Sequence, residues 1–353
     1  MRAFGSVSRL SRENRAMKPT VSVIIPAYNC GAYLGKTLAI ALEQTGVSLE
    51  VVLVDNSTDD SCRSYSDHPD SRVRYVFVQP PGVAAARNLG IRLARGKFLA
   101  FLDADDEWLP EKLSTQVAAF EKFPEAGLVF TDTTMCSDEE IFHDAMYTNV
   151  LKAWCQAHRS EVPDWYFGNL YARLLNTNCM HTSSVMIRQN ILDQTGVFDE
   201  QVQVVKIAED YDLWLRIAQS HPMVYIDRVY CKYKVLEEGF SGGMAVRGLR
   251  WLDAQIAVRE KHRRAGWVPA EHIDLLNDVL SKRYWELGWN HFGHNRFREA
   301  RKCFRESLRA RPLDLKIWLY WCSSFLPEQV VEAIRSIRQV NKENPINDPH
   351  ARH

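Results

Sequence analysis

Short apolar runs alternate with helical stretches along the first hundred residues. Four runs rich in β-branched or aromatic residues predict buried strands, and two stretches with apolar residues at helical spacing predict helices between them. The predicted strands are 21–26, 51–54, 74–78 and 98–102, and the predicted helices are 33–43 and 84–95. Because strands that alternate with helices are typical of parallel sheets, this pattern predicts an α/β fold with a mostly parallel sheet flanked by helices.

The pattern changes along the rest of the chain. Short predicted strands at 128–132, 184–187 and 223–226 are mixed with helices, of which 210–220 gives the densest signal. Beyond residue 247 the apolar spacing is helical throughout, with predicted helices at 249–265, 270–292, 297–309, 313–324 and 327–340. We therefore expect a disordered N-terminal extension (1–19), one α/β domain (20–246) whose halves divide near residue 127, and an α-helical tail (247–353).

The composition excludes several classes of protein. With 46% hydrophobic and 25% charged residues, the chain is too apolar to stay disordered and too interrupted by charge to form a bundle of membrane helices. No stretch reaches the roughly 18 apolar residues of a spanning helix. The residues before Met17 lack the apolar core of a secretory signal. We expect a cytoplasmic protein whose translation starts at Met1 or at Met17.

Charge is unevenly distributed, although 44 Lys and Arg balance 44 Asp and Glu. From Arg247 onward there are 20 Lys/Arg against 13 Asp/Glu, or +7, which leaves 24 against 31, or −7, upstream. This asymmetry predicts different partners for the two parts. The eight cysteines include no CxxC pair. The sequence therefore predicts neither a zinc site nor a disulfide framework, and a reducing cytoplasm suits these cysteines.

An acidic cluster follows the fourth predicted strand. The run FLAFL leads into Asp103, Ala104, Asp105 and Asp106, and open α/β sheets bind ligands at the carboxyl ends of their strands. If Asp103 and Asp105 continue the strand geometry, they lie about 7 Å apart on one face and repel each other by roughly 2 kcal/mol at an effective dielectric of about 20. Water can offset this repulsion in an exposed turn. Three carboxylates directly after a buried strand favour a hard divalent cation that is shared with substrate phosphates.

Three further groups have both a structural and a functional interpretation. Tyr28 and Asp55 could hold a flat heterocycle by stacking and hydrogen bonding, or they belong to ordinary turns capped by Asn29 and Asp55. Arg87, near a predicted helix start, suits an anionic ligand or is a solvated surface residue. Asp210 stands where an N-cap precedes a helix, and a carboxylate held there is also placed to act as a general base.

Five segments together resemble the family 2 glycosyltransferases. They are VSVIIPAYN, VVLVDNSTDD, GVAAARNLGIRLARGKFLAFLDADDEWLP, SSVMIR and AEDYDLWLRIA, in the order and at the spacing usual for that family, between about residues 20 and 233. The resemblance implies a GT-A fold, in which a nucleotide-binding half on a Rossmann-like sheet is followed by an acceptor half on a mixed sheet. It also implies an inverting, metal-dependent enzyme that uses Mg²⁺ or Mn²⁺ and a nucleotide-diphosphate sugar, with a UDP-sugar as the expected donor.

The resemblance assigns roles to individual residues by motif matching. The residues implied in nucleotide binding are Pro26, Ala27, Tyr28, Asp55 and Arg87, together with Asp103, Ala104 and Asp105 of the DxD motif. The implied metal ligands are Asp103, Asp105 and Asp106. Asp210 is the implied catalytic base, with Glu209 in support.

The implied reaction moves a sugar to a hydroxyl of a saccharide or lipid-linked acceptor in cell-surface polysaccharide or glycan biosynthesis, without nucleic acid. The sequence departs from the family pattern in two places. The loop that begins at Asp55 lacks the usual Gly, which shortens the base-binding loop by one residue. Lys234 follows Tyr233 where Arg is common, and it is a candidate phosphate contact.

Two other functions compete with sugar transfer. A sugar nucleotidyltransferase uses a related sheet, but it needs a Gly-rich loop with Arg and Lys after the first strand, and residues 27–30 offer none. A non-catalytic helical-repeat adaptor with an inactive front domain has no chemical reason to keep the carboxylates of Asp103, Asp105 and Asp210. We therefore favour the transferase.

Residues 284–312 resemble one tetratricopeptide unit, with Trp285, Leu287, Gly288, Phe292, Ala300, Phe304 and Pro312 at the signature positions. Such units need neighbours to bury their faces, and only one clear copy is present. Its second helix is basic on one side, with Arg298, Arg301, Lys302, Arg305 and Arg309. This helix is either a solvated face over a core stripe or a peripheral contact with anionic lipid at the inner face of the membrane.

Overall fold

The computed structural model describes residues 18–137, 139–200, 208–235, 244–327 and 329–331. The chain forms two compact units. The sheet unit comprises Met1–Asn169, Met180–Glu200 and Ser220–Lys234, and the helical unit comprises Leu170–Cys179, Gln201–Gln219 and Val235–His353. The expected N-terminal extension lies almost wholly outside the described residues, and the expected domain boundaries stay predictions.

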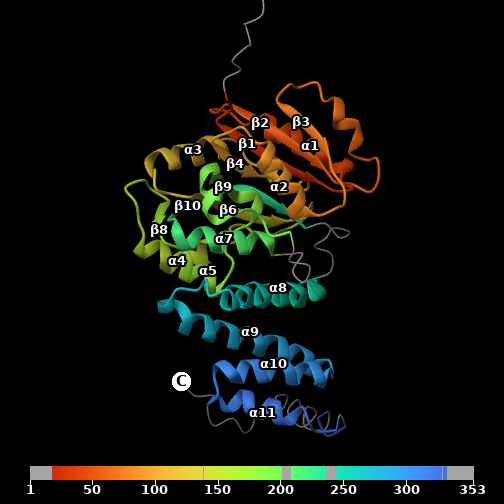
Figure 1. The fold of residues 1–353 in the computed structure, drawn as a ribbon, viewed down its shortest axis with the longest axis vertical. Helices are drawn as coiled ribbons and strands as arrows, with labels where there is room; N and C mark the ends of the chain where they lie inside the picture. The colour runs from red at the N-terminus through yellow and green to blue at the C-terminus, as the bar shows by residue number, and fades with distance from the viewer. Residues whose placement is uncertain (1–17, 138, 201–207, 236–243, 328, 332–353) are drawn as a thin grey trace, which may run out of the picture. The chain divides into compact units, whose positions relative to one another are not determined.

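The sheet unit is built on one ten-stranded sheet in the order β3-β2-β1-β4-β9-β6-β10-β5, with β7 beside β6 and β8 beside β10 (Figure 1). The strands are β1 Val21–Ala27, β2 Leu49–Asp55, β3 Val73–Phe77, β4 Phe98–Phe101, β5 Glu107–Trp108, β6 Leu128–Cys136, β7 Ile141–His143, β8 Trp165–Gly168, β9 Val185–Arg188 and β10 Met223–Lys234. The first four strands are parallel, as are β6 and β10, whereas β9 runs antiparallel to β4 and β6. The predicted mostly parallel sheet and all seven predicted strands are confirmed.

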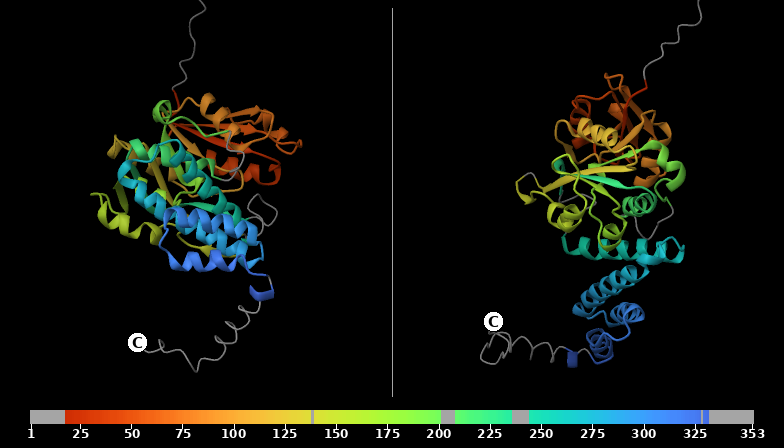
Figure 2. Two further views of the ribbon diagram at one scale, coloured as in Figure 1. Left: turned by 60° about the horizontal axis from the view of Figure 1, so that its bottom comes forward. Right: turned by 90° about the vertical axis from the view of Figure 1, so that its left-hand side faces the viewer.

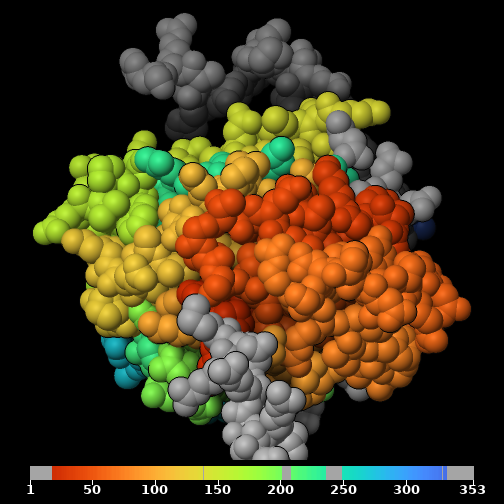
Figure 3. All heavy atoms as spheres, turned by 90° about the horizontal axis from the view of Figure 1, so that it is seen from above, coloured from red at the N-terminus to blue at the C-terminus, as the bar shows by residue number. Residues whose placement is uncertain are grey.

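Helices cover both faces of the parallel half of the sheet. Successive residues of a strand point to opposite faces, so each strand packs against helices on both sides. Alternate residues of β1, from Val21 to Ala27, share an apolar cluster with residues of α1 (Gly31–Leu42) and α3 (Lys112–Lys122). On the other face, Val52 and Val54 of β2 pack with Ala86 of α2 (Val83–Leu93). The remaining helices of this unit are α4 (Thr148–Ala157) and α6 (Leu192–Thr195), with 3-10 turns η1 (Arg63–Asp67), η2 (Thr182–Ser184) and η3 (Gln189–Ile191). Figure 3 shows one face of this unit, over β1 to α2, in red to orange.

The helical unit contains α5 (Tyr171–Asn176), α7 (Glu209–Ser220), α8 (Met244–Arg264), η4 (Ala270–His272), α9 (Ile273–Gly293), α10 (Phe297–Ala310) and α11 (Leu315–Ser323). The helices α9, α10 and α11 lie side by side in every view (Figures 1 and 2). The predicted helices are confirmed as far as Ser323, and most of the predicted helix 327–340 lies outside the described residues.

The tetratricopeptide-like segment packs through the positions that its pattern singles out. A Cβ at Gly288 of α9 would lie 2.7 Å from the Phe304 ring of α10, so only glycine allows this approach of the two helices. Phe304 and Ala300 are fully buried in a cluster with Phe292 and Ile317. The apolar stripe of α10 is therefore a core stripe, which is the first of the two interpretations of this basic helix.

Within the described part of the chain, every helix is too short or too polar to cross a bilayer.

Candidate functional site

The acidic motif forms a turn at the carboxyl end of β4. The strand ends at Phe101, and the Asp106 amide donates to the Asp103 carbonyl oxygen at 3.1 Å. The expectation that Asp103 and Asp105 continue the strand geometry is therefore wrong. Within this turn the Asp103 carboxylate still raises the pKa of Asp105, so the acidic side chains repel each other and need a counter-charge.

Asp103 is held by groups from two distant segments. The Arg87 guanidinium of α2 donates to Oδ1 of Asp103 at 2.6 Å, and the Asp103 amide donates to Oγ of Ser183 at 3.0 Å. Arg87 is almost fully buried and lies over the Phe198 ring. Because Arg87 is buried, its interpretation as a solvated surface residue is wrong. Its guanidinium is a fixed cation directly beside the first carboxylate of the DxD motif.

Asp105 carries an unbalanced charge in the same turn. Burial, together with the neighbouring Asp103 carboxylate, raises the pKa of Asp105 to about 6. A bound cation would relieve both effects, because it replaces the lost hydration and offsets the repulsion. The donor set is made of carboxylate oxygens, which suit Mg²⁺ or Mn²⁺. The residues present therefore fit a hard divalent ion.

Asp106 points into the protein. Its side chain is 1% exposed, accepts from the Ser183 hydroxyl at 2.5 Å and accepts from the Lys234 amide at 3.3 Å. Burial and the charges of Asp105 and Asp103 raise the pKa of Asp106 well above its ordinary value. The role of Asp106 as a metal ligand stays a prediction.

A second group of metal-ligating side chains lies behind this turn. Ligand atoms of Asp106, His181 and Cys231 all lie within 4.8 Å of one another. Burial lowers the pKa of His181 to about 4, so its imidazole is neutral at pH 7. Nδ1 of His181 lies 3.5 Å from the Asp106 carboxylate and 4.0 Å from the Cys231 sulfur. The sequence gives no sign of this grouping, since the three residues are far apart along the chain.

Lys234 lies next to the acidic turn. Its ammonium is 3.0 Å from the Glu107 carboxylate, which also pairs with Lys36. The Ala104 carbonyl oxygen accepts from the Thr37 hydroxyl of α1 at 2.6 Å. The turn is thus joined to α1, to the end of β10 and to η2. The predicted phosphate contact of Lys234 stays a prediction.

The residues predicted to hold the base lie at two adjacent strand ends. Ala27 of β1 pairs in register with Asp55 of β2, and Pro26 and Ala27 are buried within the sheet. Tyr28, directly after β1, is 53% exposed and is therefore accessible to a ligand. Asp55 accepts from the Tyr75 hydroxyl at 2.6 Å and from the Ser57 amide at 2.9 Å.

Glu209 and Asp210 belong to the helical unit. Because α7 begins at Glu209 and the Asp212 amide donates to the Ala208 carbonyl oxygen, Asp210 is the second helical residue and the N-cap expectation is wrong. Oδ1 of Asp210 accepts from the Tyr211 amide at 2.6 Å. Glu209 is buried and Asp210 is half-buried.

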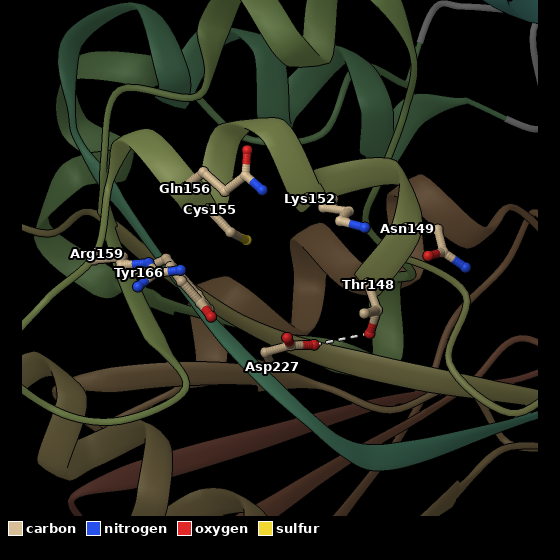
Figure 4. Close-up of a pocket in the computed structure, with 8 residues that line it drawn as sticks. All are labelled: Thr148, Asn149, Lys152, Cys155, Gln156, Arg159, Tyr166 and Asp227. Atoms are coloured by element: carbon tan, nitrogen blue, oxygen red, sulfur yellow. Dashed lines mark hydrogen bonds between the residues drawn. The ribbon is translucent and has the colours of Figure 1, made fainter.

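A separate cavity of about 260 Å³ lies between α4, β8 and β10 (Figure 4). Its polar lining includes Lys152, Arg159, Tyr166 and Asp227, and the Thr148 hydroxyl donates to Asp227 at 2.8 Å. None of the predicted site residues lines it. The cavity falls within the part of the chain that is predicted to bind the acceptor.

A family model described as glycosyl transferase family 2 matches residues 22–196. UDP-Glc:alpha-D-GlcNAc-diphosphoundecaprenol beta-1,3-glucosyltransferase WfaP of Escherichia coli is 34% identical over 199 residues, which cover 56% of this chain and 69% of that protein. The chain belongs to glycosyl transferase family 2. Chondroitin synthase of Escherichia coli is 30% identical over 76% of this chain, and an uncharacterized glycosyltransferase of Rickettsia felis is 30% identical over 61%. The chain spans only 36% and 33% of the length of these two relatives.

Solved structures show the same fold as this family 2 chain. Mannosyltransferase PcManGT from Pyrobaculum calidifontis, in complex with GDP-Man and Mn²⁺, has a TM-score of 0.58 at 20% identity and covers 94% of this chain and 82% of its own. TarS 1–349 of S. aureus, in complex with UDP-GlcNAc, has a TM-score of 0.53 at 17% identity over 86% of this chain and 91% of its own. The predicted GT-A fold is confirmed.

Ser183 is the main contributor to the site that motif matching does not assign. It lies in the segment SSVMIR, which marks the family, yet the motif names no role for the hydroxyl. In the structure this one serine bonds to both Asp103 and Asp106, and its carbonyl oxygen accepts from the Trp108 indole at 2.7 Å. Its position beside a second serine, directly before a strand, is the only available sequence signal.

Proposed function

We propose that this family 2 chain moves a sugar from a nucleotide-diphosphate sugar, with a UDP-sugar as the expected donor, to a hydroxyl of a saccharide or lipid-linked acceptor in polysaccharide or glycan biosynthesis. The observation that carries this proposal is the acidic turn after β4, in which Asp103 is fixed by a buried Arg87 and Asp105 has a pKa of about 6. An acidic turn beside an exposed Tyr28 suits a ligand that combines a heterocycle with a diphosphate. The nucleotide-sugar complexes of PcManGT and TarS support this choice of donor class.

On this proposal the two ends of the donor have separate sites. Tyr28, Asp55 and the end of β1 at Pro26 and Ala27 hold the base, and Arg87 orients Asp103. Asp103 and Asp105 hold a Mg²⁺ or Mn²⁺ ion, which would offset the negative charge that grows on the departing diphosphate. Asp106 belongs to the same predicted set of ligands. Its burial and its bond from Ser183 support a role in fixing the turn.

The acceptor needs a base, because a sugar hydroxyl is a poor nucleophile until its proton is removed. We assign this role to Asp210, supported by Glu209, from their positions in the motif AEDYDLWLRIA. A positioned general base contributes of order 10²–10⁴ in rate. Attack opposite the diphosphate in a single displacement would invert the anomeric centre.

The basic side of α10 bears on where in the cell the enzyme acts. Arg298, Lys302 and Arg305 are exposed on this helix, and an anionic membrane surface attracts such residues. We propose that they hold the chain at the inner face of the membrane, where lipid-linked acceptors are found. Because the apolar stripe of α10 is buried, this contact would be electrostatic.

The test is to incubate the full chain with UDP- and GDP-sugars and Mn²⁺ and to measure nucleotide diphosphate release. Release that stops on removal of Mn²⁺ by EDTA is expected. Pyrophosphate-dependent formation of a nucleotide triphosphate would indicate a nucleotidyltransferase instead. No turnover of any donor would favour the adaptor.

Two variants separate the proposed roles. Asp105→Ala should weaken Mn²⁺-dependent UDP binding about tenfold or more, because one metal ligand is lost. Asp210→Asn should bind UDP and Mn²⁺ normally and lose turnover by about 10²–10⁴. Asp274→Asn, an exposed residue in the first turn of α9, is the matched control. Normal turnover of Asp210→Asn would show that the base is another residue.

A further inference from the structure

Two cysteines meet beside the predicted base site. Cys30 directly precedes α1 and Cys62 directly precedes η1, and their sulfur atoms are 3.6 Å apart. Both are free thiols. Their separation of 32 positions, with no CxxC motif, hides this pair in the sequence.

The two segments approach each other closely along their whole contact. A Cβ at Gly31 would lie 2.4 Å from the Ser61 carbonyl oxygen, so the backbones are as near as glycine permits. The Asn29 amide donates to the Ser57 hydroxyl at 2.9 Å, and the Thr58 amide donates to the Asn29 side chain at 2.9 Å. Cys30 and Cys62 thus face each other in a region that is held in place on both sides of the pair.

The environments of the two thiols differ. The hydrogen bond from Cys30, with further bonds from Ser57 and Ser61, lowers the pKa of Cys62 to about 6 although burial opposes this shift. The bond to Cys62, together with burial, raises the pKa of Cys30. Cys62 is therefore largely a thiolate at neutral pH, and thiolates are the nucleophiles of sulfur chemistry. Cys62 is fully buried whereas Cys30 is half-buried, so an oxidant reaches the pair from the Cys30 side, and Cys30 lies beside Cys62 as the resolving thiol.

We propose that Cys30 and Cys62 form an oxidation-sensitive pair that a peroxide converts into a disulfide, and that this disulfide weakens nucleotide binding at the adjacent strand ends. The Cys62 thiolate attacks the peroxide and takes one oxygen, which gives a sulfenic acid and releases water or an alcohol. The Cys30 sulfur then attacks the Cys62 sulfur, the S–S bond forms and water leaves. An external dithiol reverses the reaction by thiol–disulfide exchange and is itself oxidised.

The effect on nucleotide binding follows from the distance between the two sulfur atoms. Bonded sulfur atoms are about 2.05 Å apart, so the two sulfur atoms must come closer by roughly 1.5 Å than in the present contact of 3.6 Å. Because the backbones at Gly31 and Ser61 are already in tight contact, the loops that carry the two cysteines must rearrange. Tyr28 lies two residues before Cys30, and the loop after Asp55 leads to Cys62. A shift of this size would displace the residues that we propose for the base. This second part of the inference rests on the proposed function, whereas disulfide formation does not.

The experiment treats the full chain with hydrogen peroxide, alkylates the remaining thiols and maps the peptides by mass spectrometry. We expect a loss of about 2 Da, the mass of two hydrogen atoms, and one peptide that joins Cys30 to Cys62. Dithiothreitol should reverse both changes. Cys30→Ser and Cys62→Ser should each abolish the linked peptide. Cys322→Ser, which removes an exposed cysteine of α11, is the matched control and should keep it.

Binding of UDP with Mn²⁺ is then measured on the reduced and the oxidised protein. We expect the Kd to rise about tenfold or more on oxidation in the native chain and to stay constant in Cys30→Ser. If both thiols are alkylated after peroxide, the pair itself is wrong. If the disulfide forms and the Kd is unchanged, the effect on nucleotide binding is wrong. A disulfide in a protein that binds no nucleotide in either state would overturn the proposed function and the nucleotide part, and would leave the thiol pair standing.

Discussion

The Ser183 hydroxyl connects two residues of the acidic turn. A backbone amide and a buried carboxylate both use this hydroxyl, so the loss of this one oxygen removes the hydrogen bond of the Asp103 amide and one of the hydrogen bonds of the Asp106 carboxylate. Buried groups that lose their partner cost about 1–3 kcal/mol. The same hydroxyl sets the distance between Asp103, which is partly exposed, and Asp106, which is buried.

Ser183→Ala should therefore lower the free energy of unfolding by about 1–3 kcal/mol and raise the Kd for UDP with Mn²⁺. Ser184→Ala is a close control, because Ser184 is equally buried but donates only to the His181 carbonyl oxygen at 2.7 Å. The control should lose stability and keep its affinity for the nucleotide. Urea titration and isothermal calorimetry on both variants measure the two effects. Equal affinities in the two variants would remove Ser183 from the site.

At the scale of single residues, the sequence identifies the charged residues of the site better than it identifies the groups that surround them. Motif spacing identifies Asp103, Asp105 and Arg87, and the structure brings Arg87 and Asp103 into contact. The hydroxyl of Ser183 could not be predicted, because its partners are about 80 residues away along the chain. The pair of Cys30 and Cys62 could not be predicted for the same reason. The two residues meet because the order of the strands in the sheet brings their loops together.

Among the elements, α2 is held closely against the sheet. A Cβ at Gly90 would lie 2.5 Å from a methyl carbon of Ile24 in β1, so the helix rests directly on the strand. This close approach places Arg87, one turn earlier on α2, beside Asp103. The glycine thus connects helix packing to the geometry of the DxD motif.

Gly90→Ala should cost about 1–3 kcal/mol of stability, because the core must move to admit one methyl group. It should also weaken binding of UDP with Mn²⁺, since Arg87 moves with α2. Gly293→Ala at the end of α9 is the control, since its Cβ would meet no atom within 4 Å. In a double-mutant cycle, Ile24→Ala should reduce the cost of Gly90→Ala, because it removes the clashing methyl group. Strictly additive effects would show that the clash is relieved elsewhere.

A buried charge cluster joins α7 to α8 within the helical unit. The fully buried Asp212 accepts from Arg216 at 2.9 Å, from Lys261 at 2.8 Å and lies 3.1 Å from Nε2 of His262. Burial alone would raise the pKa of Asp212, but the His262 bond and the charges of Arg216 and Lys261 outweigh it and hold the pKa well below its ordinary value. Asp212, the second aspartate of the segment EDYDLW, therefore has a structural role.

Asp212→Asn should lower the free energy of unfolding by about 3 kcal/mol at pH 7, because it removes the buried negative charge beside the half-buried Arg216 and Lys261. A carboxyl with a depressed folded pKa stabilises above its unfolded pKa of about 3.9, and this contribution is lost as the pH falls toward the folded pKa. The difference between native chain and variant should therefore shrink by about 1 kcal/mol between pH 5 and pH 3. Urea titrations at these pH values measure it, with Asp274→Asn as the control. A constant difference would contradict the depressed pKa.

Most strands and helices with regular apolar spacing are predictable to within a few residues, although β10 continues to Lys234, well beyond the predicted strand 223–226. The helix α3 is not predictable, because Lys112 and Gln116 interrupt its apolar face although both are fully buried. The Lys112 ammonium donates to Gln116 at 2.7 Å and lies over the Trp108 ring at 4.2 Å. Burial lowers the pKa of Lys112 to about 7. Polar residues that satisfy one another inside the core remove the periodicity on which such predictions depend.

At the scale of the whole molecule, the packing of the described residues does not explain why positive charge is concentrated in the tail. The tail from Arg247 onward carries +7, and the α10 stripe of Ala300, Phe304 and Leu308 that could have entered a bilayer is buried in the protein core. Arg301 and Arg309 on the same helix are also engaged, with the Ser324 carbonyl oxygen and the Glu306 carboxylate. Arg309 is exposed as well but paired, and the other exposed cations of α10 are Arg298, Lys302 and Arg305.

The full chain should sediment with vesicles that contain phosphatidylserine and stay in solution with purely zwitterionic vesicles. Each Lys or Arg near an anionic surface contributes about 1 kcal/mol, so reversing Arg298, Lys302 and Arg305 to Glu should reduce the partition coefficient about 100-fold or more. Reversal of the engaged pair, Arg301 and Arg309, should have a smaller effect on binding. Raising the salt to about 1 M shortens the screening length to about 3 Å and should release the native chain. Sedimentation that ignores lipid charge, or a triple variant that binds like the native chain, would show that this helix is only a solvated surface.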